Sequence, residues 1–112
     1  MQKLQDRLIK FRDERDWKQF HNPKDMAISL SLEAAEVLEH FQWKSKEEIE
    51  KYIKEHKEHI EEELADVFYW TLLISHDLGI DIADALTKKM KKNEERYPIN
   101  KTKGSAKKWN EL

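Results

Sequence analysis

Apolar residues recur at intervals of three and four positions along most of the chain, which is the spacing of an amphipathic α-helix. The first such run predicts a helix over residues 2–15, with Leu4, Leu8 and Phe11 on one face. The next segment, 16–21, breaks this period and is expected to form an ordered loop.

Two further helix starts follow in the sequence. The Asn22 side chain can cap a first turn that has Pro23 at its first helical position, and this helix is predicted to reach about residue 42. The next helix starts after Ser45, which can form a capping box with Glu48.

No Gly or Pro interrupts residues 46–78. This stretch is therefore either one long helix or two helices, with a bend expected near residues 55–58. Gly79 ends it.

The last predicted helix runs from its N-cap, Asp81, to about Tyr97, and Pro98 stops it. The tail over residues 98–112 is polar and basic. We expect this tail to be mobile unless a ligand or a neighbouring chain orders it.

The composition narrows the class of fold. The 112 residues include two glycines, two prolines and no cysteine, which argues against a β-sandwich and excludes disulfides and zinc–thiolate sites. No run of about 18 apolar residues could span a membrane, and the charged segment 1–11 does not resemble a signal peptide. Because no repeat or linker divides the sequence, we expect a single all-α domain over residues 1–112, soluble and cytoplasmic.

The net charge of −2 hides an uneven distribution. Residues 88–108 carry nine Lys or Arg and two Glu, a balance of +7, so the rest of the chain carries −9. Such a basic limb could bind phosphate, nucleic acid or the acidic body of the protein itself.

The second predicted helix has an unusually narrow polar face. A stripe about 60° wide on the helical wheel contains Glu33, Glu36, Ser29 and His40, and apolar strips border it on both sides. Two carboxylates three residues apart raise each other's pKa unless a cation or a donor lies between them. The ordinary alternative is a solvated surface, which the apolar borders make less favourable.

The helix after residue 60 repeats this arrangement with Glu63 and Asp66, and Trp70 follows one turn later. If the two helices pack with their stripes facing, four carboxylates come together. Oxygen ligands favour Mg²⁺, with Mn²⁺ as the alternative, over zinc or copper. A di-iron site would use Glu-x-x-His, a motif that the chain lacks.

The last helix presents Lys89, Asn93 and Arg96 on one face, directly followed by Tyr97. Cations opposite a magnesium site suggest a polyphosphate ligand. The alternative is a helix C-terminus whose lysines suit the helix dipole.

Two other features point to binding surfaces. Trp17 and Trp43 lie in or beside loops, where an indole ring can stack on a nucleobase or pack in a core or interface. Residues 67–78 are apolar on almost every face, which predicts a homo-oligomer because one small bundle cannot bury all of them.

Five motifs together resemble the MazG-like nucleotide pyrophosphohydrolases, and among these the dCTP pyrophosphatases in particular. The similarity covers about residues 4–110. The motifs are Arg15-Asp16-Trp17-x-Gln19-Phe20-His21, Glu33-x-x-Glu36, Phe41-Gln42-Trp43, Glu63-x-x-Asp66 and Lys89-x-x-x-Asn93-x-x-Arg96-Tyr97-Pro98.

The resemblance implies a bundle of four to five helices that assembles as a tetramer or dimer. It also implies Mg²⁺-dependent cleavage of a nucleoside triphosphate to the monophosphate and pyrophosphate. We expect no membrane or nucleic-acid partner. By motif position, the metal ligands would be Glu33, Glu36, Glu63 and Asp66. The nucleoside pocket would be lined by Trp17, His21, Trp43 and Trp70. The phosphates would be bound by Lys89, Asn93, Arg96 and Tyr97.

The chain also departs from the vertebrate dCTP enzymes that it resembles. Trp70 stands where they have Tyr, Leu8 stands where they have His, and the span from Trp43 to Glu63 is shorter and lacks their Pro and Gly. These differences bear on the preferred base and sugar.

The sequence hypothesis is a nucleotide-pool enzyme acting on dCTP or a modified pyrimidine relative, with Glu36 as the general base. A dUTP or broad-specificity dNTP pyrophosphatase is the alternative within the same superfamily. A non-catalytic helical module that binds nucleic acid or a partner is the alternative from another class.

Overall fold

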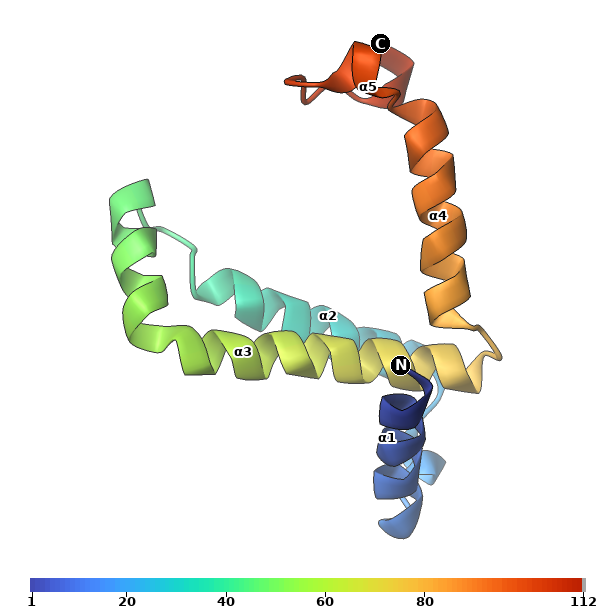
Figure 1. The fold of residues 1–112 in the computed structure, drawn as a ribbon. Helices are drawn as coiled ribbons and strands as arrows, with labels where there is room; N and C mark the ends of the chain where they lie inside the picture. The colour runs from blue at the N-terminus through green and yellow to red at the C-terminus, as the bar shows by residue number, and fades with distance from the viewer. Residues whose placement is uncertain (112) are drawn as a thin grey trace. The chain divides into compact units, whose positions relative to one another are not determined.

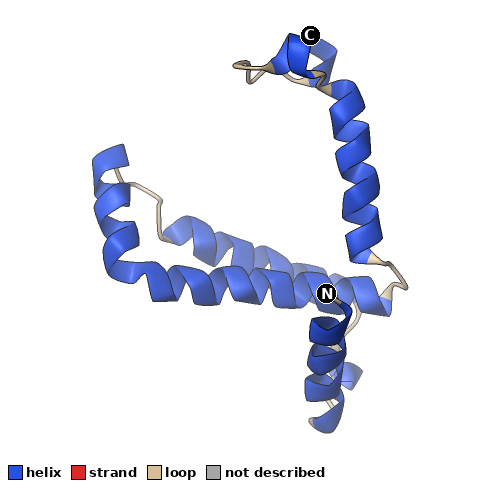
Figure 2. Ribbon diagram, in the orientation of Figure 1, coloured by secondary structure: helices blue, strands red, loops and turns tan. Residues whose placement is uncertain are grey.

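The computed structural model describes residues 1–111, and every regular element in that range is a helix (Figure 2). The all-α prediction is therefore confirmed for this part of the chain. Within it, no helix has both the length and the apolar composition that crossing a membrane requires. The chain forms two compact units, Met1–Gly79 and Ile80–Leu112, each of which is described by itself.

The first unit begins with α1, Gln2–Glu14, close to the predicted range. The expected loop that follows contains a short 3₁₀ turn, Lys18–Phe20. The Gln19 side chain orders this loop by donating to the backbone carbonyl and the carboxylate of Asp16, both at 2.9 Å.

Helix α2, Pro23–Glu39, starts as predicted because the Asn22 side chain accepts a hydrogen bond from the backbone N–H of Asp25 at 2.9 Å. It ends three residues before the predicted position 42. The backbone tightens into a turn there, and Trp43 adopts a left-handed φ of 66°, which a helix cannot continue through.

Helix α3, Lys46–Asp77, begins with the predicted capping box, in which both hydrogen bonds between Ser45 and Glu48 form. It is one helix with a kink at His56, where φ is −126° and ψ is 24°. The kink lies within the predicted range 55–58, and it separates a short N-terminal arm from a long arm that runs alongside α2 (Figure 1).

The packing of α2 against the long arm of α3 forms the centre of the first unit. Met26 of α2 and Leu72 and Leu73 of α3 are almost completely buried. These are the only hydrophobic side chains in the described part of the chain that reach this degree of burial. The core is small, and other large apolar side chains are exposed.

A buried ion pair connects α1 to the C-terminal end of α3. The Arg12 side chain is 1% exposed, and its guanidinium donates to both carboxylate oxygens of Asp77, at 2.8 and 2.9 Å. Gln5 adds a hydrogen bond to the backbone carbonyl of Leu72 at 2.9 Å. Two charged or polar side chains of α1 therefore set its position on α3.

The second unit consists mainly of α4, Ile82–Arg96, whose predicted N-cap Asp81 accepts from the backbone N–H of Asp84 at 3.0 Å. Tyr97 ends this helix, as predicted. The tail that follows contains the short helix α5, Ile99–Thr102, and a 3₁₀ turn, Trp109–Glu111, which the sequence pattern did not predict. The mobility of residues 98–112 stays a prediction.

The Arg12–Asp77 pair predicts a contribution to stability that is lost in acid. Hydrogen bonding to Arg12 lowers the pKa of Asp77, so the folded state keeps this carboxylate ionised where the unfolded state takes up a proton. The stabilisation is complete above the ordinary Asp pKa of about 4 and is lost as the pH falls through the lowered pKa.

Replacing Asp77 by Asn leaves the buried Arg12 charge without its counterion and is expected to cost about 3 kcal/mol at pH 7. Urea unfolding at pH 7 and pH 3 measures both effects, with a smaller difference between variant and wild type at pH 3. Asp13→Asn is the matched control, because the exposed Asp13 carboxylate lies 3.8 Å from Arg12 and should contribute less than about 1 kcal/mol. Equal stability of Asp77→Asn and wild type at pH 7 would contradict this assignment.

Candidate active site

Four acidic side chains from α2 and α3 lie close enough to perturb one another. Burial, a hydrogen bond with Glu36 and the negative charges of Asp66, Glu36 and Glu63 raise the pKa of Glu33 to about 7. Such a shift requires that all four groups share one region of the first unit. In the structure, the two acidic stripes therefore lie close together, as the sequence predicted.

Two of these carboxylates carry a buried oxygen that lacks a hydrogen-bond partner: Oε2 of Glu33 and Oε2 of Glu63. A buried acceptor without a donor is costly, and a cation is one group that would satisfy it. In the described part of the chain, however, no three His, Asp or Glu side chains are already arranged around a single metal position. The carboxylates would have to reorient to hold one.

His40, in the turn after α2, contacts this acidic region. Its Nε2 lies 2.9 Å from Oε2 of Glu63, although the two atoms are not aligned for a hydrogen bond. Its Nδ1 lies 2.6 Å from the hydroxyl of Tyr52. The helical wheel had placed His40 on the same stripe as the two acids of α2, but Tyr52 was not foreseen because it comes from the other side of the α3 kink.

The structure brings together two of the four residues predicted to line a nucleoside pocket. The His21 and Trp70 rings meet edge to face, with centroids 5.2 Å apart. Trp17 packs instead against Phe11 at 5.6 Å. Trp43 lies on the turn after α2 and is 92% exposed, so within this chain it does not line a pocket.

The His21 ring lies beside the Arg12–Asp77 pair. Burial, and next the positive charge of Arg12, lower the pKa of His21, so the neutral ring is favoured near pH 7. Its Nδ1 is buried and has no hydrogen-bond partner. His21 can therefore offer an unused polar atom next to the indole of Trp70.

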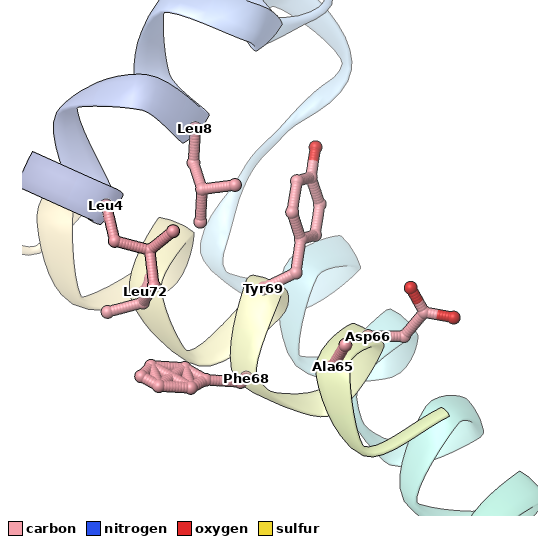
Figure 3. A pocket seen from close by; sticks show the side chains of 7 residues that line it. All are labelled: Leu4, Leu8, Ala65, Asp66, Phe68, Tyr69 and Leu72. Carbon is pink, nitrogen blue, oxygen red and sulfur yellow. The ribbon is translucent and has the colours of Figure 1, made fainter. Parts of the chain in front are cut away.

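An apolar groove of about 330 Å³ lies between α1 and α3, with Asp66 at its border (Figure 3). Leu4 and Leu8 of α1 line it from one side, and Phe68 and Leu72 of α3 from the other. Leu8 thus gives this groove an apolar wall at the position where the resemblance implies a histidine in the vertebrate enzymes.

The residues predicted to bind phosphate all belong to the second unit. The spacing of Lys89, Asn93 and Arg96 places them on one face of α4, and Tyr97 is the C-cap residue. Lys89 is exposed, whereas the other three are half-buried. The neighbouring Lys88 pairs with Asp84 at 2.8 Å on the surface, as expected for a lysine without a role in binding.

Comparison with known proteins agrees with the resemblance found in the sequence. A dCTP pyrophosphatase 1 from Rattus norvegicus is 38% identical over 104 residues, and one from Homo sapiens is 34% identical over the same length. Each alignment covers 91% of this chain, which spans 61% of either relative. The chain therefore spans about three-fifths of the length of the curated relatives it matches.

The fold also has a close counterpart among solved structures. A crystal structure of a pyrophosphatase from Archaeoglobus fulgidus superposes with a TM-score of 0.83 at 42% sequence identity, covering 88% of this chain and 92% of that one. The MazG-like family model matches residues 28–112, which include all four clustered acids. On these grounds the chain belongs to the MazG-like family.

Proposed function

We propose that this protein is a nucleoside triphosphate pyrophosphohydrolase that cleaves dCTP, or a related modified pyrimidine deoxynucleotide, to the monophosphate and pyrophosphate. The observation that carries the proposal is the cluster of four carboxylates between α2 and α3, in which the buried Oε2 of Glu33 has no hydrogen-bond partner. The names of the relatives, dCTP pyrophosphatase and pyrophosphatase, support the same reaction class. Its role would be the removal of unwanted nucleotides from the pool.

Mg²⁺ is the proposed cofactor, with Mn²⁺ as the alternative. The donor set fits, because Glu33, Glu36, Glu63 and Asp66 offer only oxygen atoms and crowd enough negative charge to raise the pKa of Glu33. When bound there, the cation would neutralise negative charge on the triphosphate.

The remaining steps fall to side chains of the protein. Glu36, the exposed member of the α2 pair, would accept the proton of a water that attacks the α-phosphorus. A bond from the water oxygen to the α-phosphorus forms as the bond from that phosphorus to the bridging α–β oxygen breaks, which releases pyrophosphate. Lys89 and Arg96 would offset charge on the departing pyrophosphate, and Asn93 and Tyr97 would donate hydrogen bonds to it.

The nucleoside would bind beside the aromatic residues. His21 and Trp70 already contact each other, and the unused Nδ1 of His21 could read a polar edge of the base. Trp17 and Trp43 are proposed to complete this pocket, Trp43 from its exposed turn. The larger Trp70 and the apolar Leu8 are the positions at which a preference other than dCTP, such as dUTP or several dNTPs, would arise.

A panel of dNTPs tests the reaction and the base together. With Mg²⁺ present, we expect pyrophosphate release to be fastest with dCTP or 5-modified dCTP, and to stop when EDTA is added. Glu63→Gln, which removes one ligand charge, should reduce turnover by at least about 100-fold while the far-UV circular dichroism stays helical. Full Mg²⁺-dependent activity in this variant would contradict the assignment of Glu63 as a metal ligand.

Salt-sensitive DNA binding without cleavage of any nucleotide would favour the non-catalytic helical module over the enzyme.

Crowding of the carboxylates predicts a stability trade-off in the metal-free protein. Because like charges repel, Glu33→Gln should raise the free energy of unfolding in EDTA by on the order of 1 kcal/mol, while abolishing the stabilisation that Mg²⁺ gives the wild type. Urea unfolding with and without Mg²⁺ measures both. Glu62→Gln removes a charge from an exposed site and should change stability by less than about 0.5 kcal/mol. A loss of stability in metal-free Glu33→Gln would contradict the expected repulsion among the carboxylates.

Self-association as a tetramer, or a dimer, is also proposed. The second apolar strip of α2 includes Ile28 and Leu32, whose side chains are 48% and 61% exposed. On α3, Leu64 and Phe68 lie one turn apart and are also exposed. Exposed apolar side chains in register along helices are typical of surfaces that copies of a chain bury against each other.

Sedimentation equilibrium tests this assembly. The wild type should give a mass of two or four times 13.6 kDa, and Leu32→Asp should shift the equilibrium toward the monomer by about tenfold or more, because it buries a charge in an apolar contact. Lys24→Asp places the same charge on an exposed position of α2 and should leave the mass unchanged. A wild-type monomer at all concentrations would exclude the proposal.

A further inference from the structure

His40 bridges the two arms of the kinked helix α3. Tyr52, which faces its Nδ1 at 2.6 Å, lies on the short arm before the kink at His56. Glu63, which faces its Nε2 at 2.9 Å, lies on the long arm after it. One imidazole therefore connects an acidic group of the candidate site to a part of the molecule outside that site.

Tyr52 is the fixed end of this connection. Its ring stacks on His56 with centroids 4.2 Å apart and an interplanar angle of 19°. The Lys44 ammonium lies 4.4 Å from the centre of the Tyr52 ring. The Nδ1 of His56 lies 3.2 Å from the backbone carbonyl of Tyr52. The His56 ring and the Lys44 ammonium thus hold the phenol in place, so its hydroxyl is a well-defined partner for His40.

Hydrogen-bond chemistry sets the direction of the chain. An ionised Glu63 carboxylate can only accept, so the nitrogen of His40 that faces it must carry a proton. In a neutral imidazole the other nitrogen is then an acceptor, and the Tyr52 hydroxyl donates to it. For the neutral ring, the order of donation would therefore be Tyr52 to His40 to Glu63. The tyrosine selects the tautomer of the histidine that can hold the carboxylate.

We infer that Tyr52 and His40 form a positioning relay that orients Glu63 toward the metal, a role that rests on the proposed function of the acidic cluster. In this structure the Nε2 and Oε2 atoms lie at hydrogen-bond distance without alignment, so Oε2 lacks a true donor. With Nε2 facing Oε2, the other oxygen of Glu63, Oε1, is the atom that would remain for a cation. Outer groups of this kind commonly fix the geometry of ligating carboxylates.

The relay provides a hydrogen-bond donor, which the four acids cannot provide for one another. Each of them is repelled by the others, so an ionised carboxylate with a free rotation would turn away from its neighbours. A donor behind Glu63 opposes this rotation. His40 is well suited to this, since its side chain is 11% exposed and it lies on the same stripe of the helical wheel as Glu33 and Glu36.

Four variants separate this role from a merely structural one. Tyr52→Phe removes the hydroxyl alone and keeps the ring that stacks on His56, so it should fold. His40→Leu removes both nitrogens, whereas His40→Gln restores an amide N–H near the position of Nε2. His59→Gln is the control, because His59 is exposed and its ring centroid is 6.4 Å from that of His56.

Calorimetric titration of Mg²⁺ into the nucleotide-free 112-residue chain is the primary measurement. We expect His40→Leu to weaken Mg²⁺ binding by about tenfold, the lower end of outer-group effects on metal affinity. Tyr52→Phe should weaken it by about threefold, which corresponds to one net hydrogen bond. His40→Gln should recover most of the affinity and His59→Gln should match the wild type. In dCTP hydrolysis, the Mg²⁺ concentration for half-maximal rate should rise in the same order, while KM for dCTP at saturating Mg²⁺ stays constant.

The outcomes distinguish this inference from the proposal beneath it. If folded His40→Leu and Tyr52→Phe bind Mg²⁺ as tightly as the wild type, the relay is wrong while the pyrophosphohydrolase assignment stands. An equal loss in His40→Gln and His40→Leu also overturns it, because the amide should replace Nε2. If the wild type neither binds Mg²⁺ nor releases pyrophosphate, the proposed function and the relay both fail.

Discussion

Electrostatic repulsion among the four acids is the constraint around which the rest of the first unit is arranged. Left to themselves, Glu33 and Glu63 would move apart, yet each keeps a buried oxygen without a partner. The packing of α2 on α3 holds them together, and that packing rests on the fully buried Met26, Leu72 and Leu73. An unfavourable cluster of like charges that apolar packing holds together is typical of a functional site rather than a structural one.

Another pair of charged side chains in this unit, in contrast to the four acids, is fully paired. Arg12 and Asp77 are paired in a two-pronged geometry, with both carboxylate oxygens occupied. Asp77 shares a helix face with Glu63 and Asp66, so position on the helix does not separate it from them. What separates it is the guanidinium that α1 brings to it. The pair anchors α1, and it also keeps a positive charge beside His21, which favours the neutral ring.

Local chemistry explains which features could be predicted from the sequence. Helix starts at Asn22, Ser45 and Asp81 were predictable, because a cap is decided within four residues. The two acid pairs were predictable because both lie between apolar strips on their own helices. The Arg12–Asp77 and His40–Tyr52 contacts were not, because each joins segments whose approach depends on a turn or a kink. The helix within the tail, Ile99–Thr102, was missed because only four residues carry its pattern.

The small core of the first unit has a consequence for how the protein behaves on dilution. In the described chain, three hydrophobic side chains are almost fully buried, so a single copy has little apolar burial to set against its conformational entropy. If copies of the chain cover the strip that includes Leu32, association contributes part of the free energy that stabilises the folded state. The melting temperature would then rise with protein concentration, and the nanomolar conditions of a sensitive enzyme assay would sample a different ensemble from those of a concentrated stock.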